Sequence, residues 1–182
     1  MAINPNPYFL NQEQEDRGYR AIARLALFWG PIELQIEGLI VLLRNLHGET
    51  DESFPVSFSK KSAELAVRLK REPELKEFRA RLAIHTGRSK ELHVIRTHVV
   101  HSYFQGQNLD GQLMFGRSNQ KAGVSYTEAR YKIEQIDSTA DELIAIHNAI
   151  APFWQELSTF VLPEIRRRNT ETITRASGHT DQ

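Results

Sequence analysis

The sequence predicts a mainly α-helical fold: an antiparallel helical bundle with a small β-hairpin or three-stranded sheet inserted before the last long helix. Apolar residues recur every three or four positions along three long stretches, which is the period of an amphipathic helix. Between residues 103 and 131 that period is lost, and short apolar and aromatic runs flank the turn signal Asn108-Leu109-Asp110-Gly111. Helical stretches joined by short loops favour antiparallel packing.

The first long helix is expected from about Asn11 to Leu46. Its apolar stripe consists of residues three or four positions apart: Leu25, Phe28, Ile32, Ile36, Leu39 or Ile40, and Leu43. Gly30-Pro31 interrupts this stretch, and proline lacks an amide donor and clashes with the preceding turn, so a kink or a break is expected there. His47-Gly48 is predicted to end the helix, because glycine is common just beyond a helix C-terminus.

Two further helices are predicted between residues 57 and 99. Ser57 or Ser59 can cap the first of them, which ends just before Glu72-Pro73. Proline suits the first turn of a helix, so the next helix is expected to start there. Gly87 is expected to interrupt that helix before it resumes toward its C-terminal end.

The last predicted helix is long and runs from about Glu134 to Arg168. Pro152 and Pro163 lie within it and are expected to bend it. Residues 169–182 are polar and lack helical periodicity, so they are predicted to form a disordered tail. The remaining residues, 1–168, are predicted to form one domain, because the whole chain of 182 residues is no longer than one domain of ordinary size.

The composition is that of a soluble globular protein, with 40% hydrophobic and 25% charged residues. Cysteine is absent, which excludes disulfides, thiolate chemistry and cysteine-ligated zinc. The first residues are polar and show no secretory signal. The longest apolar-rich stretch, residues 32–43, contains glutamates and is expected to be too short to span a bilayer. A cytoplasmic location is therefore predicted.

The charge of the chain is unevenly distributed, although it sums to zero. Residues 58–92 contain ten basic residues against five acidic ones. Such a segment can meet RNA phosphates, or it can form a solvated helix face with mixed charges. Only two aromatic residues, Phe58 and Phe78, occur in this segment, which favours the solvated face.

One short motif contains candidate catalytic residues. It is Arg96-Thr97-His98-Val99-Val100-His101, near the C-terminal end of the third predicted helix. A histidine has an ordinary pKa near 6.5 and can take or give a proton at neutral pH. An arginine stays protonated and binds phosphate oxygens in a forked geometry, which stabilises the charge of a phosphoryl transition state. Together these residue types supply a group that transfers protons and a group that binds anions.

An arginine followed four to six residues later by a histidine, at the end of a core helix, is similar to the signature of the HEPN superfamily. The resemblance implies a bundle of four or more helices over residues 11–168 and a metal-independent endoribonuclease activity, often in toxin–antitoxin or phage-defence systems. It places Arg96 and His101 at the catalytic positions. The family often has Asn, Asp or His directly after the arginine, where this chain has Thr97, and His98 follows as a further supporting polar residue.

The same resemblance implies a homodimer with a composite site at its interface, an RNA substrate and, in some members, an antitoxin partner. The spacing gives an independent reason to consider a dimer. Five residues place Arg96 and His101 about 140° apart around an ideal helix, so the two do not share a face. Either the helix frays at His101, or two subunits bring their motifs together at a twofold axis.

A structural role for the motif is the competing interpretation. Arg96 can bridge to Glu33 or Glu37, which lie one turn apart on the first helix, because a buried charge needs a partner. His101 can donate to a backbone carbonyl. The protein would then be a non-catalytic helical interaction module. Arg88 is expected to line the same cleft as Arg96, as a supporting residue.

A metal site is not expected. His98 and His101 can share a helix face, but His93 lies off that face. The sequence also lacks the Glu-x-x-His repeats that build a di-iron site in a bundle. We therefore expect neither a metal ion nor another cofactor.

Overall fold

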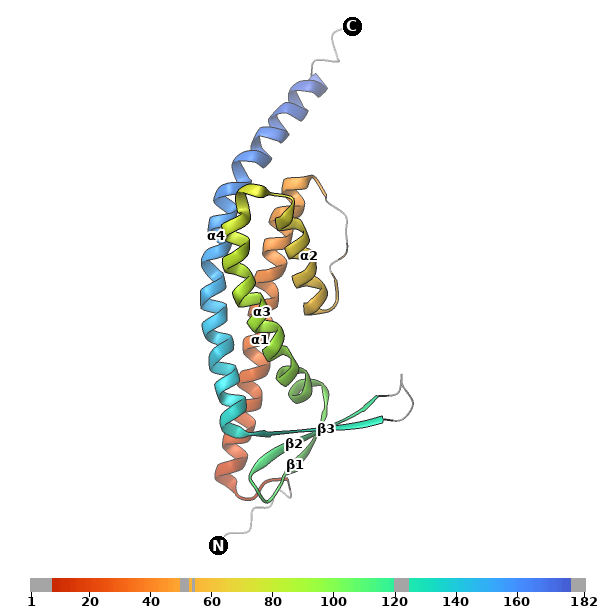
Figure 1. The fold of residues 1–182 in the computed structure, drawn as a ribbon, viewed down its shortest axis with the longest axis vertical. Helices are drawn as coiled ribbons and strands as arrows, with labels where there is room; N and C mark the ends of the chain where they lie inside the picture. The colour runs from red at the N-terminus through yellow and green to blue at the C-terminus, as the bar shows by residue number, and fades with distance from the viewer. Residues whose placement is uncertain (1–7, 50–52, 54, 120–124, 178–182) are drawn as a thin grey trace. The chain divides into compact units, whose positions relative to one another are not determined.

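The computed structural model describes residues 8–49, 53, 55–119 and 125–177, and it is mainly helical (Figure 1). Its elements, in chain order, are α1 (Gln12–His47), α2 (Phe58–Lys70), the 3-10 helix η1 (Pro73–Leu75), α3 (Lys76–His101), β1 (Tyr103–Gln107), β2 (Gln112–Asn119), β3 (Ser125–Lys132) and α4 (Ile133–Ser177). The three strands form one antiparallel sheet in the order β1-β2-β3. The predicted class, mainly helical with a small sheet before the last helix, is confirmed.

The chain divides into two compact units. The first unit contains residues 1–32 and 87–147, and the second contains residues 33–86 and 148–182. Each of α1, α3 and α4 contributes one segment to each unit. The sheet and the Arg96–His101 motif belong to the first unit, whereas α2 belongs to the second. The single domain expected over residues 1–168 stays a prediction.

α1 runs without interruption through Gly30-Pro31, so a break at this pair was a wrong prediction. The residues on either side, Trp29 and Ile32, are almost completely buried. Burying a large apolar side chain contributes roughly 1.5–3 kcal/mol, and a proline inside a helix costs about 3 kcal/mol. Two such buried side chains therefore offset the proline and keep the helix continuous.

The signals at the ends of α1 and α2 are confirmed. α1 ends at His47, and Gly48 follows with a φ of 72°, a left-handed conformation that favours glycine. Ser57 caps α2, and its side-chain oxygen accepts a hydrogen bond from the backbone amide of Lys60.

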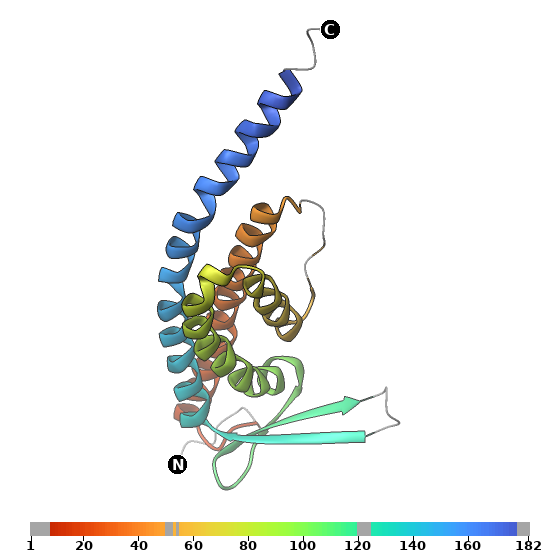
Figure 2. The ribbon, with the colours of Figure 1, turned by 45° about the horizontal axis from the view of Figure 1, so that its top comes forward.

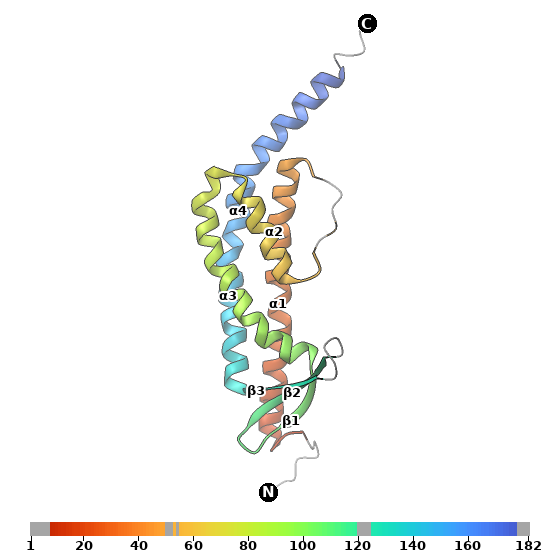
Figure 3. The same cartoon turned by 45° about the vertical axis from the view of Figure 1, so that its right-hand side comes forward.

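In the second unit, buried ion pairs join α2 to α1, beside which it lies (Figure 3). The guanidinium of Arg44 donates to Glu64 at 2.8 and 3.0 Å, and the same carboxylate accepts from Arg68 at 2.7 Å. Lys61 contacts Glu37 at 2.6 Å. Two of the four basic residues of α2, Lys61 and Arg68, are thus paired with carboxylates within the protein.

α3 is also continuous, and the interruption expected at Gly87 was a wrong prediction. A glycine inside a helix costs only about 0.5–1 kcal/mol relative to alanine. Buried residues after it, Ser89, Leu92 and Val99, hold this part of the helix in the first unit. Packing outweighs the local preference.

The sheet of the first unit has one buried face. Leu113 and Phe115 of β2 alternate with more exposed residues and are almost fully buried. Phe104 of β1 pairs with Phe115 in the strand register, and their rings lie 5.6 Å apart. Gly106 has a φ of 113° at an irregularity of β1, which a side chain would strain.

β2 and β3 continue as a two-stranded ribbon beyond the last residue paired with β1 (Figure 2). β1 pairs with β2 only as far as Gly116, whereas β3 pairs with β2 as far as Asn119. Arg117 and Ser118 therefore have a strand neighbour on one side only. This leaves the edge of β2 open beside the start of β1.

α4 extends further than the sequence indicated. It contains Pro152 and Pro163 without ending at either, and Figure 1 shows it changing direction toward its C-terminal end. It continues to Ser177, so both the end at Arg168 and the disordered tail were wrong predictions as far as that residue. Residues 178–182 lie outside the described part of the chain. Once a helix is established, each further residue that is fixed adds one hydrogen bond, whereas nucleation fixes several residues for one bond, so the helix can continue through polar sequence.

α1 is long and apolar enough, by length and composition, to cross a membrane. The expectation that residues 32–43 are too short to span a bilayer stays a prediction. Core helices of soluble proteins pass the same test, and 39% of the apolar window is buried within the protein. The cytoplasmic location stays a prediction.

Candidate functional site

The Arg96–His101 motif lies where α3 changes into β1. α3 ends at His101, a single residue follows, and β1 begins at Tyr103. The motif was predicted to lie near the C-terminal end of a core helix, and this is confirmed. The buried neighbour Val99 fixes the helix, while His101 is exposed at its end.

The side chains of Arg96 and His101 meet within one chain. Nη1 of Arg96 lies 2.6 Å from Nε2 of His101. Their helical separation of about 140° is bridged because the arginine side chain is long and the histidine occupies the last position of the helix. A second subunit is therefore not needed to bring these two residues together.

The contact defines the protonation state of the imidazole. A guanidinium has only donors, so Nε2 of His101 must accept and cannot carry a proton. Partial burial, followed by the positive charges of Arg96 and Arg117, lowers the pKa of His101 below its ordinary value of 6.5. His101 is thus neutral at pH 7, and its basic nitrogen accepts a hydrogen bond from Arg96.

Arg96 is anchored on aromatic residues of the first unit. Its guanidinium lies over the ring of Trp29, 5.8 Å from the centroid, and that ring lies 4.8 Å from the imidazole of His93. Its Nε is buried and makes no hydrogen bond to any residue that the structure describes. The indole face restricts the orientation of the guanidinium and attracts its charge.

Thr97 and His98, predicted as supporting residues, bond to neighbours other than Arg96 and His101. Thr97 Oγ1 lies 3.3 Å from Nε2 of His93. Nδ1 of His98 lies 2.6 Å from the hydroxyl of Tyr131 on β3, and burial raises the pKa of that tyrosine, which keeps the phenol neutral. The His98–Tyr131 bond ties β3 to the last turn of α3.

An open pocket of about 400 Å³ lies beside His101. It is lined by the end of α3 and the first and second strands: Val100, His101, Ser102, Tyr103, Arg117 and Ser118. A smaller pocket of about 140 Å³ lies next to it, lined by His98 among others, and shares Ser102 and Arg117 with the first. His101 therefore faces a solvent-accessible space large enough for a small ligand, whereas Arg96 lies behind it and is not among the lining residues of either pocket.

Arg117 was missed by reasoning from the sequence. No local motif marks it, since it lies far along the chain from Arg96. The alternation Leu113, Phe115, Arg117 was the available signal, because residues two apart on a strand share a face. Only the pairing of β2 with its neighbours brings that face to the end of α3.

Arg88 was expected to share a cleft with Arg96, but it lies elsewhere. It is exposed and donates to Glu142 of α4, with one contact at 2.8 Å, and to Glu91. The hydrogen bonds to Glu142 and Glu91 raise the pKa of Arg88. It belongs to a surface ion pair, and the expectation that it supports the site was wrong.

Glu33 and Glu37 were the expected partners of Arg96 in the structural interpretation. Both belong to the second unit, where Lys61 lies 2.6 Å from Glu37 and 3.8 Å from Glu33. The bridge to Arg96 stays a prediction. Lysine on α2 provides the counter-charge that the sequence could not locate.

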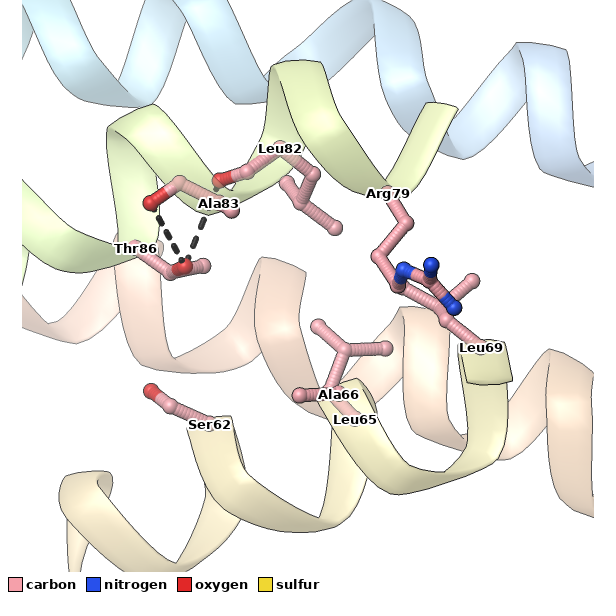
Figure 4. A pocket seen from close by; sticks show the side chains of 8 residues that line it. All are labelled: Ser62, Leu65, Ala66, Leu69, Arg79, Leu82, Ala83 and Thr86. Carbon is pink, nitrogen blue, oxygen red and sulfur yellow. Dashed lines mark hydrogen bonds between the residues drawn. The ribbon is translucent and has the colours of Figure 1, made fainter. Parts of the chain in front are cut away.

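The described residues include no group of three or more His, Asp or Glu side chains arranged to hold a metal ion. A separate small pocket of about 40 Å³ lies between α2 and α3 of the second unit (Figure 4). Its walls are mainly apolar, and the hydroxyl of Thr86 donates to backbone carbonyls of its own helix. Arg79 is its single titratable side chain. The site at the end of α3 therefore contains more groups that can transfer protons or bind anions than this pocket does.

Comparisons with protein-family models, with curated proteins and with solved structures found no match to this chain.

Proposed function

We propose that this protein is a HEPN-like, metal-independent endoribonuclease in which Arg96 and His101 act together on an RNA phosphodiester. The observation that carries the proposal is the contact of 2.6 Å between Nη1 of Arg96 and Nε2 of His101. It pairs a permanent cation with a neutral imidazole beside an open pocket. A base and an anion-binding group are the two parts that this chemistry needs without a metal ion.

The reaction begins when an RNA phosphate enters the pocket. The guanidinium of Arg96 exchanges the imidazole nitrogen for phosphate oxygens, to which it binds more strongly because they are charged. Nε2 of His101 is then free to take the proton of the 2′-hydroxyl. The O2′–P bond forms, the P–O5′ bond breaks, and the products are a 2′,3′-cyclic phosphate and a 5′-hydroxyl. The leaving oxygen needs one proton in return.

A homodimer supplies that proton in the proposed arrangement. Two copies face each other across a twofold axis, and the bound phosphodiester offsets the positive charge of the arginines, so that His101 of the second copy takes a proton from solvent and gives it to the leaving oxygen. The imidazolium formed in the first copy releases its proton to solvent. The dimer site would then be composite in its proton transfers, while the arginine and histidine of each copy already meet. A cytoplasmic protein with an antitoxin partner fits this activity, because an unrestrained ribonuclease would damage the cell.

The second candidate is a non-catalytic helical interaction module. It is favoured by the anchoring of the motif, since Arg96 lies over Trp29 and His98 bonds to Tyr131. In this case the polar residues hold α3 against its neighbours. Such a protein would lose stability, rather than an activity, when Arg96 is removed.

One experiment separates the two candidates. Purified protein is incubated with mixed RNA in excess EDTA, next to the variants Arg96→Ala, His101→Ala and, as a control, Arg88→Ala. Arg88 lies on the same helix but is exposed and paired with Glu142. The nuclease predicts cleavage by the wild type and the control, and loss in the other two variants at unchanged helicity. An absence of cleavage, with Arg96→Ala unfolding at lower temperature, supports the interaction module.

A further inference from the structure

We propose that Arg117 of β2 is a second substrate-binding residue of this site, which holds an RNA phosphodiester against His101. This inference rests on the proposed function and extends it to a part of the chain outside the Arg-x4-His motif. It assigns phosphate binding to two cations from different elements, Arg96 on α3 and Arg117 on the sheet.

The strand register explains why Arg117 reaches the site. Leu113 and Phe115 point to the buried face of the sheet, and Arg117 is the next residue on that face. Unlike Phe115, it has no partner on β1, because the pairing with β1 ends at Gly116. The side chain therefore lies one step beyond the core, beside the end of α3, where it lines both pockets.

The composition of the larger pocket suits a phosphate. Its lining combines Arg117 with His101 and two hydroxyl residues, Ser102 and Ser118, and includes no carboxylate. Guanidinium and hydroxyl groups are the usual donors to phosphate oxygens. Tyr103 is 75% exposed at the same pocket, so an aromatic ring is available to an unpaired base next to the bound phosphate.

Arg117 differs from most arginines of this protein in its charge pairing. Ten arginines form ion pairs with carboxylates: Arg17, Arg24, Arg44, Arg68, Arg71, Arg81, Arg88, Arg130, Arg167 and Arg168. Within the described ranges of the chain, Arg117 forms no such pair. The acid beside it in the smaller pocket, Glu128, bonds to Arg130 at 2.5 Å. The charge of Arg117 is therefore available to an incoming anion.

The electrostatics around His101 follow from the same arrangement. Positive charge from Arg96 and Arg117 disfavours the imidazolium and leaves a neutral base. A bound phosphate diester offsets that charge, so the protonated imidazole becomes more stable once substrate is present. The two arginines thus keep the His101 imidazole neutral and able to accept a proton before substrate binds, and they stabilise the anionic transition state afterward.

The test uses a probe that this chemistry cannot cleave. A short fluorescent single-stranded DNA has the phosphodiesters but lacks the 2′-hydroxyl, so binding is measured apart from catalysis. Its affinity is determined against salt concentration for the wild type, Arg117→Gln, Arg117→Lys and Arg130→Gln. Arg130 is the matched control, since it is exposed in the same sheet and is paired with Glu128. Thermal unfolding of each variant shows that the fold is intact.

We expect Arg117→Gln to weaken binding about five- to tenfold, as for the loss of one charge-assisted contact, and to reduce the salt slope by about 0.7. Arg117→Lys should bind with intermediate affinity, because lysine keeps the charge but not the fork. Arg130→Gln should bind like the wild type. Equal affinity and salt slope of Arg117→Gln and Arg130→Gln would overturn the proposal, and so would a wild type that binds neither the DNA nor RNA.

The failure of this inference is distinguishable from the failure of the proposed nuclease. If the wild type cleaves no RNA in EDTA but Arg117→Gln still loses DNA binding selectively, then the phosphate site stands and the nuclease does not. If the wild type cleaves RNA and Arg117→Gln leaves both binding and KM unchanged, then the nuclease stands and the role of Arg117 is refuted.

Discussion

Nη1 of Arg96 lies 2.6 Å from Nε2 of His101, although the two residues project about 140° apart from the axis of an ideal helix. The contact exists because His101 is the last residue of α3 and the arginine side chain spans the intervening turn. It makes the basic nitrogen of the histidine an acceptor in the free protein. Changes that release this nitrogen should therefore be visible in its titration.

The first prediction concerns the pKa of His101. Partial burial and the charges of Arg96 and Arg117 hold it below 6.5, so removing one charge in Arg96→Ala should raise it toward that value. Burial and Arg117 remain, so the rise should be incomplete. An NMR titration of the histidine ring resonances measures both values. A wild-type pKa above 6.5 would contradict the prediction.

The same titration has a consequence for stability. The folded-state pKa of His101 is lower than that of the unfolded chain, so the unfolded state binds the proton more readily. This contribution to the free energy of unfolding is fully present above about pH 6.5 and is lost as the pH falls toward the folded-state value. Denaturation of the wild type and His101→Ala at pH 8 and pH 5 should show a smaller decrease in the variant.

The second prediction concerns the ion network of the second unit. Glu64 accepts hydrogen bonds from Arg44 and Arg68, which are only 6% and 5% exposed. Glu64→Gln keeps the shape but removes the negative charge between two buried cations, and we expect it to lower the free energy of unfolding by about 3 kcal/mol. Urea denaturation measures this change.

Glu142→Gln is the matched control for that substitution. Glu142 also pairs with an arginine, but Arg88 and Glu142 are 47% and 36% exposed. Exposed pairs contribute about 0–1 kcal/mol because water and salt screen them. Equal effects of the two substitutions would mean that the buried network is solvated in solution.

The order of elements and their main signals could be predicted from the sequence because they depend on local chemistry. The cap at Ser57, the end at His47-Gly48 and the loss of helical period near residue 103 each depend on a few adjacent residues. The break considered at Gly30-Pro31 and the interruption expected at Gly87 were wrong for the opposite reason. Their local preferences are outweighed by burial of residues that a single sequence does not show to be in contact.

The residues of the candidate site also fall into those that the sequence could predict and those that it could not. Arg96 and His101 could be predicted because they are near in sequence, and because arginine binds anions and histidine transfers protons. Trp29, Tyr131 and Arg117 could not, since α1, β3 and β2 reach the motif only through tertiary packing. A strand position says which face a residue occupies, but not which helix end that face meets.

The third prediction contrasts two glycines. Gly106 has a φ of 113°, and a Cβ there would lie 3.1 Å from the carbonyl oxygen of Tyr8, so Gly106→Ala should cost about 1–3 kcal/mol. Gly87 lies in a helix with open space around it, so Gly87→Ala should stabilise the protein by about 0.5–1 kcal/mol. Chemical denaturation measures the change in the free energy of unfolding for each variant and shows whether it is a loss or a gain. A destabilised Gly87→Ala would indicate that the helix is locally distorted there.

The fourth prediction concerns the His98–Tyr131 bond, which joins α3 to β3 at 2.6 Å. If its role is to hold the strands of the site against the helix, then Tyr131→Phe and His98→Ala remove the same interaction. Each should lower the free energy of unfolding by about 1 kcal/mol, and the double variant should lose less than the sum of the two. Urea denaturation of all four proteins gives the coupling. Strictly additive losses would show that the two side chains act independently, and that their hydrogen bond does not anchor β3 to α3.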